Sequence, residues 1–195
     1  MEPLTTSDPS LPLPTPRRAL HTRIVKSEGF LRDDGLWEVD GELIDRKSYA
    51  YQDLERGLLS VGYPVHHMHA RLTLNHDMQV VEAYATMQAN PFAYCLGALK
   101  GVDGLKGAHV GSGWRRSVND AMGETNGCAH IRELFLAMAT TAFQTISCYR
   151  DQYMKELGSP RAAGSDMPFF LDNCHSWERS SQVVATHFPK FHLKR

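Results

Sequence analysis

Apolar residues recur at helical spacing through the second half of the chain. The repeated positions lie three or four residues apart and continue for about six turns, as expected for one buried helix face. They are Ile131, Leu134, Phe135, Met138, Ala142, Ile146, Tyr149 and Tyr153. Thr125 and Asn126, which precede this stripe, are residue types that cap a helix start. The pattern therefore predicts a long amphipathic helix over residues 127–156, with its apolar stripe in the core.

The first half of the chain shows the period-two alternation of β-strands instead. Short alternating runs fill residues 17–51, and Asp34-Gly35 is a favourable hairpin turn between two of them. Asp40-Gly41 offers a second turn, so we expect a meander of two or three strands. The other elements expected in this half are a hairpin of residues 65–74 and 78–87 and a loop at residues 51–61.

Histidines are concentrated in the first strand of that hairpin, where neighbouring residues point to opposite faces. His66 shares its face with the apolar residues at positions 68, 70, 72 and 74. The opposite face carries His67, His69 and Arg71, and Tyr84 shares a face with two polar residues of the partner strand. Two histidines and an arginine in register indicate either a solvated outer face or the wall of a site.

Two short helices are predicted between the hairpin and the long helix, at residues 92–99 and 112–122. Trp114 and Arg115 lie in the first turn of the second one. An arginine at a helix start opposes the helix dipole. Arg115 is therefore either a simple surface charge or a residue that holds an anionic group or stacks on an aromatic ring. Trp114 has two interpretations as well, a core position and a binding role.

The domain organisation follows from length and composition. The first 16 residues contain five prolines and predict a flexible arm, and residues 17–195 suit one domain. A possible strand at residues 180–188 follows a loop at residues 158–164. The predicted fold class is α+β, with a β meander and hairpins packed against one long amphipathic helix and short accessory helices.

Net charge and cysteine content limit the partners and the cellular compartment that we expect for this protein. A net charge of −1 without a basic block argues against nucleic acid or an anionic membrane surface as the main partner. We see neither an apolar run long enough to cross a membrane nor a leader-like segment. The four cysteines show no C-x-x-C spacing, so a reduced, cytoplasmic protein is expected.

The start of the long helix holds Cys128 and His130 close together. A helix N-terminus favours a thiolate and keeps an imidazole neutral, because it carries about half a positive charge. Glu133, three residues after His130, lies on the same side and is expected to orient the imidazole. The alternative interpretation is a small core cysteine beside an ordinary surface histidine.

Several strings together resemble the bacterial domain of unknown function family 2889, over about residues 20–190. They are GFLRDDGLWEVDGELID, the pairs His67-Met68 and Arg71-Leu72, Asn90-Pro91 with Cys95, GCAHIREL, and the Asp172-x-Cys174-x-x-Trp177 tail. GCAHIREL departs slightly from the family's Gly-Cys-Thr-His-Leu form, although Cys128 and His130 are retained. Asn-Pro before a cysteine and a Gly-Cys-Ala helix start also resemble iron–sulfur scaffold proteins, whose remaining ligand pattern is not matched.

The family resemblance implies a part in the bacterial breakdown of aromatic compounds. The activity it implies is that of a cofactor-independent lyase, which removes formaldehyde from a lignin-derived aromatic dimer. Such chemistry needs a neutral base, an acid and a cation near the developing charge. The expected catalytic residues are His67 or His130 as base, Tyr84 as acid, and Arg71 or Arg115 as cation. The expected substrate-binding residues are His69, Trp114, Arg115, Cys128 and Glu133.

Two other function classes remain open from the residues. One is a zinc or iron–sulfur site built from Cys95, Cys128, His130 and Cys174, although these are scattered singly rather than in close pairs. The other is a non-catalytic module that binds a ligand through the same pocket. We expect no cofactor and no bound metal. A homodimer is expected, because the proline-rich arm and exposed strand edges suit a partner chain.

Overall fold

The computed structural model of the chain describes residues 10–158, 167, 168 and 170–194. The chain divides into two compact units, Met1–Arg150 and Asp151–Arg195, and each is described by itself. Of the predicted arm, residues 1–9 lie outside the described residues, and residues 10–16 are exposed. Most of the predicted loop at residues 158–164 also lies outside them. The single domain expected for residues 17–195 stays a prediction.

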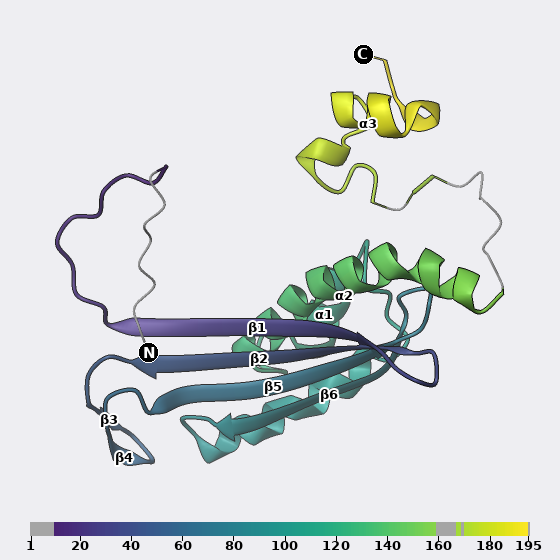
Figure 1. The fold of residues 1–195 in the computed structure, drawn as a ribbon. Helices are drawn as coiled ribbons and strands as arrows, with labels where there is room; N and C mark the ends of the chain where they lie inside the picture. Colours follow the sequence, from purple (N-terminus) through teal and green to yellow (C-terminus); the bar gives the residue numbers. More distant parts are fainter. Residues whose placement is uncertain (1–9, 159–166, 169, 195) are drawn as a thin grey trace. The chain divides into compact units, whose positions relative to one another are not determined.

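The first unit is built on a four-stranded antiparallel sheet in the order β1-β2-β5-β6 (Figure 1). The combination of this sheet with several helices confirms the predicted α+β class. The strands are β1 (His21–Leu31), β2 (Trp37–Lys47), β5 (Pro64–Leu74) and β6 (Val80–Ala89). Both hairpin predictions are confirmed at residues 32–36 and 75–79. In the first turn, Gly35 has a φ of 86°, a conformation that glycine adopts without steric cost.

The turn predicted at Asp40-Gly41 is wrong, because β2 continues through both residues. Gly41 lies at a helix contact instead: a Cβ added there would come within 2.6 Å of the Met138 sulfur. The loop predicted at residues 51–61 is also wrong, since it forms a small hairpin of β3 (Tyr51–Asp53) and β4 (Gly57–Leu59). Asp53 stabilises this turn by accepting backbone hydrogen bonds from residues 55 and 56.

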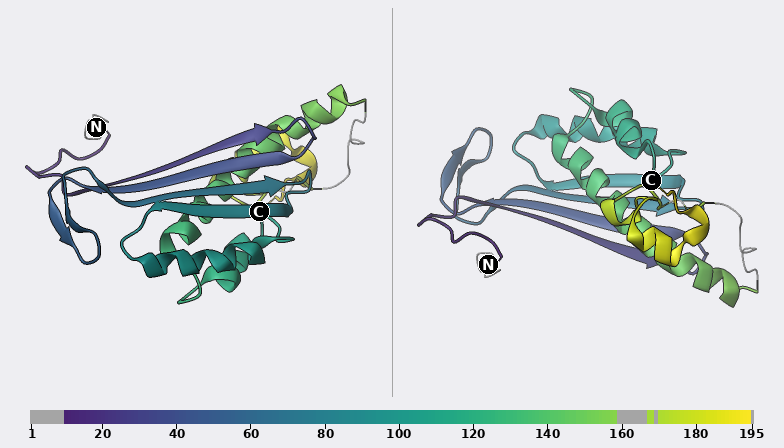
Figure 2. Two further views of the ribbon diagram at one scale, coloured as in Figure 1. Left: turned by 90° about the horizontal axis from the view of Figure 1, so that it is seen from below. Right: turned by 90° about the horizontal axis from the view of Figure 1, so that it is seen from above.

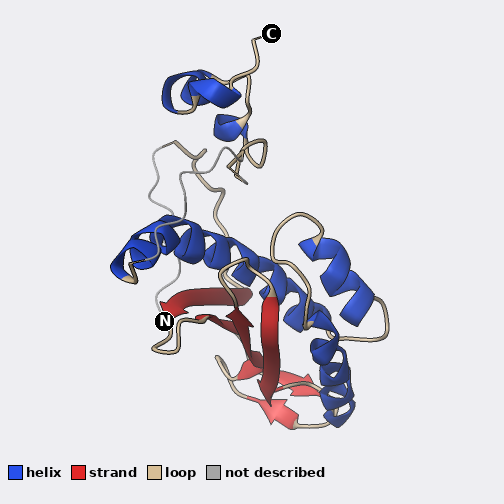
Figure 3. Cartoon of the chain, turned by 90° about the vertical axis from the view of Figure 1, so that its right-hand side faces the viewer, coloured by secondary structure: helices blue, strands red, loops and turns tan. Residues whose placement is uncertain are grey.

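The long helix α2 (Ala129–Glu156) begins two residues later than predicted, and its part within the first unit packs on one face of the sheet (Figures 1 and 3). Its predicted apolar stripe is confirmed from Ile131 to Ile146, since Ile131, Leu134, Phe135, Met138, Ala142 and Ile146 are all buried. The prediction is wrong at Tyr149, which is 38% exposed, and Tyr153 is only half-buried. Close approach depends on small residues of the sheet. A Cβ added at Gly29 of β1 would lie only 1.9 Å from the Thr145 hydroxyl oxygen. We call the sheet face that contacts α2 the inner face, and the opposite one the outer face.

Two shorter helical segments lie beside the sheet and the start of α2 (Figure 2). The first, η1 (Ala93–Leu105), is a 3-10 helix that begins after the predicted Asn90-Pro91 signal and contacts β6. The second, α1 (Trp114–Met122), confirms the predicted helix and contacts η1. Trp114 is buried, and its indole nitrogen donates a hydrogen bond to the Phe135 carbonyl at 3.0 Å, which ties α1 to α2.

Among its described residues, the second unit contains the end of α2 and three short helical segments: η2 (His175–Trp177), α3 (Gln182–His187) and η3 (Pro189–Phe191). The strand suggested for residues 180–188 is wrong. Ser181 begins a helix there, because its hydroxyl accepts a hydrogen bond from the Val184 backbone N–H. In the part of the chain that the structure describes, no helix is both long enough and apolar enough to cross a membrane.

Candidate active site

The centre of the candidate site is Asp45, a buried carboxylate near the end of β2. It lies on the inner face, in line with Leu43 and Gly41, and its side chain is only 1% exposed. The strand register pairs it with Arg23 of β1 on one side and with His66 of β5 on the other. An ionised carboxylate is costly to bury unless cations and hydrogen bonds surround it. The neighbouring strands supply both.

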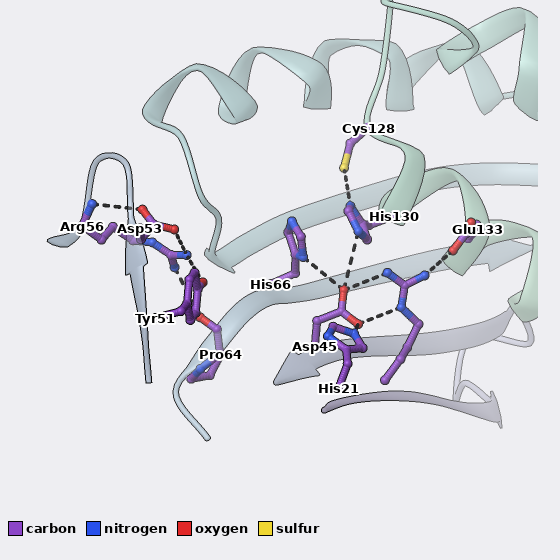
Figure 4. A network of polar contacts seen from close by, with 11 residues as sticks. His21, Asp45, Tyr51, Asp53, Arg56, Pro64, His66, Cys128, His130 and Glu133 are labelled. Carbon is purple, nitrogen blue, oxygen red and sulfur yellow. Dashed lines mark hydrogen bonds and ion pairs between the residues drawn. The ribbon is translucent and has the colours of Figure 1, made fainter. Parts of the chain in front are cut away.

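Four side chains converge on Asp45 (Figure 4). Arg23 donates two hydrogen bonds, from Nε to Oδ1 at 2.7 Å and from Nη2 to Oδ2 at 2.8 Å. His21 Nε2 lies 3.1 Å from Oδ1, and His66 Nδ1 lies 3.0 Å from Oδ2. His130, in the first turn of α2, places its Nε2 at 3.5 Å from Oδ2. We call these five residues the Asp45 cluster.

The carboxylate of the cluster is ionised at neutral pH. Burial by itself raises the pKa of Asp45, but the hydrogen bonds from Arg23 and His21 outweigh this effect and lower it to about 2. An ionised carboxylate only accepts hydrogen bonds. His66 must therefore carry its proton on Nδ1 to bond Asp45, which leaves its Nε2 unprotonated with a free lone pair.

The imidazoles of His66 and His130 are both held in the neutral form. Burial lowers the pKa of His66, and the nearby His130 lowers it further. Burial also lowers the pKa of His130, and the positive charge of Arg23 acts in the same direction. The two rings stack with their centroids 3.8 Å apart and their planes 30° apart. The arrangement provides a base that is available at neutral pH beside a second imidazole.

The helix start contributes two further residues around the cluster. Cys128, which directly precedes α2, places its sulfur 3.7 Å from Nδ1 of His130, so the two residues are in contact. Glu133 accepts a hydrogen bond from Nη1 of Arg23 at 2.6 Å. The expectation that Glu133 orients His130 is therefore replaced by a different contact, in which Glu133 and Asp45 together fix the Arg23 guanidinium.

A polar pocket adjoins the cluster through Glu133. It has a volume of about 620 Å³ and is lined by residues of α1, of the α1–α2 connection and of α2. Arg115, which sequence reasoning assigned to substrate binding, lines it together with Arg132 and Glu133. The volume lies in the range of small-molecule sites. Trp114 lies elsewhere, because its ring is buried against α2 rather than offered to a ligand.

The other residues expected to be catalytic lie on the outer face. His67, next to His66 in the strand, bonds Glu42 at 2.7 Å, and His69 lies on the same side. Arg71 forms an exposed ion pair with Asp40, at 2.6 Å from Nε to Oδ1, and is paired in the register with the exposed Tyr84. The two candidate bases, His67 and His130, therefore lie on opposite sides of the sheet, because His130 stacks on His66 and successive residues of β5 point to opposite faces.

The cysteine-based metal set is not assembled in the part of the chain that the structure describes. Among those residues, the groups with converging ligand atoms are Asp45 with His66 and His130, and Glu42 with His67 and His69. Neither group contains a cysteine. Cys174 lies in the second unit, and Cys128 contacts His130 on the ring nitrogen opposite to the one that faces Asp45.

Sequence reasoning missed His21, Arg23, Asp45 and His66. One signal could have found Asp45: it occupies the same face of its strand as Leu43 and Val39, so a charge stands in an apolar row. His66 gives the same signal, as the one polar residue on a face shared with Met68 and Leu72. Charged residues on a buried strand face need partners across the sheet.

Comparisons with known proteins identify the family of this chain but do not assign an activity to it. A family model described as "Protein of unknown function (DUF2889)" matches residues 21–144, which is more than half of the chain. The matched segment begins at His21 and includes the whole Asp45 cluster. Neither the curated proteins nor the solved structures contain a match to this chain.

Proposed function

The chain belongs to the protein family of unknown function DUF2889, and we propose that it is an enzyme performing acid–base chemistry on a small molecule at the Asp45 cluster. One observation carries the proposal. An ionised, buried Asp45 accepts a hydrogen bond from the Nδ1–H of His66 and so leaves Nε2 available as a base, beside the second neutral imidazole of His130. A carboxylate that fixes the tautomer of a histidine is a recurrent arrangement in general base catalysis.

Three members of the cluster and the neighbouring Cys128 have distinct roles in this proposal. His66 is the base, and His130 is positioned to receive or return a proton next to it. Arg23 supplies a fixed positive charge, held by two carboxylates at distances of 2.7 Å and 2.6 Å. A preorganised charge of this kind stabilises negative charge that develops during a reaction. Cys128 contacts His130 and contributes to its orientation.

The reaction that we propose for this site is a carbon–carbon cleavage that releases formaldehyde from an aromatic dimer. His66 Nε2 takes the hydroxyl proton of a primary carbinol, and the electron pair of the O–H bond forms the C=O bond of formaldehyde. The C–C bond breaks, and its electrons form a C=C bond as the neighbouring aryl ether oxygen leaves as a phenolate. The proton held by the histidines then neutralises the phenolate. Protons and electrons balance without a cofactor.

The test is turnover of a lignin-derived dimer with the connectivity HO–CH₂–C–C–OAr, in which one carbon separates the primary carbinol from the aryl ether carbon, so that the C=C bond can form as the phenolate leaves. We expect equimolar formaldehyde and phenol, formed without added cofactor and equally well in the presence of EDTA. Formaldehyde is measured with a dicarbonyl reagent and the aromatic products by chromatography. Tight binding of such dimers without any product would contradict the proposal and favour a ligand-binding module.

We also propose that the protein is a cytoplasmic homodimer. The four cysteines, all within the described residues, are free thiols, as is usual in a reducing compartment. Leu54 and Leu58 of the β3–β4 hairpin are 87% and 74% exposed, so this hairpin offers apolar surface to a second chain. Sedimentation at micromolar concentration tests the dimer, and a species of 21.9 kDa alone would refute it.

A further inference from the structure

The outer face of the sheet carries a second set of converging side chains, separate from the Asp45 cluster. His67 and His69 are two residues apart in β5, so both imidazoles stand on the same side. Glu42 of β2 lies directly opposite His69 in the strand register. Its Oε1 is 2.7 Å from His67 Nε2 and 4.0 Å from His69 Nε2, and the three ligand atoms lie within 4.8 Å of one another.

One atom of this set lacks a partner. Nε2 of His69 is buried and makes no hydrogen bond within the described residues, although the rest of its side chain is 38% exposed. Glu42 Oε1, at 4.0 Å, is beyond hydrogen-bonding distance. A buried polar atom without a partner is energetically costly, so such an atom points to a group that satisfies it when bound.

We propose that Glu42, His67 and His69 bind one divalent transition-metal ion, of which Zn²⁺ is the best match. Two imidazole nitrogens and a carboxylate oxygen are ligands that zinc takes at about 2.0–2.2 Å. In a tetrahedral site with that bond length, the ligand atoms are about 3.3–3.6 Å apart. The separations of 2.7 and 4.0 Å need only small side-chain rotations to reach these values.

Charge distinguishes this set from the Asp45 cluster, which also has two histidines and a carboxylate. Both oxygens of Asp45 accept hydrogen bonds from Arg23, whose positive charge repels a cation. Among the described residues, no arginine bonds Glu42 in this way. Its cross-strand neighbour Lys26 forms its short ion pair with Glu28, at 2.6 Å, and acts on Glu42 only as a weaker electrostatic neighbour. Glu42 is therefore not enclosed by a fixed cation as Asp45 is.

The exposure of the ligands leaves coordination positions for water or a further ligand. The side chains of His67, His69 and Glu42 are 20%, 38% and 33% exposed. Three protein ligands with an open position are typical of zinc sites that bind an exchangeable group. The site lies on the sheet face opposite to the proposed base, so it stands independently of the proposed acid–base activity.

The experiment is a zinc titration of the EDTA-dialysed, full-length protein against a chromogenic chelator, with the metal content checked by mass spectrometry. We expect one zinc ion per chain and a loss of affinity of at least about 10- to 100-fold in His69→Gln and in Glu42→Gln. Asp40→Asn removes a neighbouring outer-face carboxylate and is the matched control, with unchanged zinc affinity. Circular dichroism confirms that each variant is folded.

Two results would overturn the inference. One is an absence of zinc binding by the wild-type protein at micromolar metal. The other is zinc binding that survives His69→Gln but is lost in His130→Gln, which would place the metal in the Asp45 cluster. Cobalt substitution adds an independent readout. A thiolate-to-metal charge-transfer band would show a cysteine ligand and would also contradict the assignment.

Discussion

Both faces of strand β5 pair a histidine with an acidic residue, but the acidic residue is buried on the inner face and partly exposed to solvent on the outer face. On the inner face, His66 lies against an aspartate that is 1% exposed and against the ring of His130. On the outer face, His67 pairs with a glutamate that is 33% exposed. The two histidines are neighbours in sequence. The pleat alone assigns one to a buried, charged cluster and the other to a solvated surface.

The difference in burial changes what each ion pair does. The inner pair of Arg23 and Asp45 must be complete, because a buried charge without its partner is strongly destabilising. The outer pair of Arg71 and Asp40 is as short, at 2.6 Å, but water competes for both groups, and such pairs contribute about 0–1 kcal/mol. Short distances on the outer face are therefore no measure of energetic or catalytic importance.

The largest expected difference between the faces is in turnover. His66→Gln and His130→Gln remove the proposed base and its neighbour, and each should lower kcat by about two to four orders of magnitude. Arg71→Gln and Tyr84→Phe, on the outer face, should keep near-wild-type kcat. The rate of formaldehyde release and the thermal midpoint of each variant check this. A large loss of turnover in the outer-face variants, with normal turnover in the inner-face variants, would place the catalytic site on the outer face instead.

Stability should differ between the faces almost as much. Asp45→Asn removes the charge that Arg23 requires, and we expect a loss of about 3 kcal/mol in the free energy of unfolding, as for a broken buried pair. The matched outer-face variant, Asp40→Asn, should cost about 1 kcal/mol or less. Urea unfolding followed by circular dichroism measures both. Equal losses would mean that Asp45 is effectively solvated.

The packing of α2 on the inner face predicts a smaller effect. Gly29→Ala places a methyl group within 2.7 Å of the Thr145 Cβ, and overpacking of this kind costs about 1–3 kcal/mol. Thr145→Ala should relieve part of the clash in a double-mutant cycle. Gly97→Ala, where an added Cβ meets nothing within 4 Å, is the control. Additive effects of the two changes would show that α2 and β1 are not in contact there.

The pH dependence of stability should be the smallest effect, with a defined sign. The pKa values of His66 and His130 are lowered in the folded state, so below about pH 6.5 the unfolded chain binds more protons and stability falls. Asp45 adds a second loss between about pH 4 and its folded pKa of about 2, amounting to at most about 2 kcal/mol. Unfolding midpoints from pH 8 to 2 measure both steps. In Asp45→Asn the lower step should be smaller but still present, because the lowered pKa values of Asp34, Asp53 and Asp172 also contribute below about pH 4.

The sequence by itself determined the elements whose signals are local. The spacing from Ile131 to Ile146 specifies one helix face, and Asp34-Gly35 specifies a turn, because both patterns act within a few residues. The alternation around His66 and His67 likewise separated the two faces of β5. Local patterns failed where a distant contact prevailed: Asp40-Gly41 has turn chemistry, yet these residues pair on both sides within the sheet and Gly41 admits the Met138 side chain.

The candidate site was decided by the tertiary structure alone. Asp45, Arg23 and His66 come from three strands, and His130 comes from a helix 85 positions after Asp45. No spacing rule connects these residues, because the strand register and the position of α2 bring them together. Sequence supplied Cys128 and His130 as a local pair at a helix start. The carboxylate that fixes the histidines is visible only once the sheet is assembled, since its function depends on burial and on cross-strand partners.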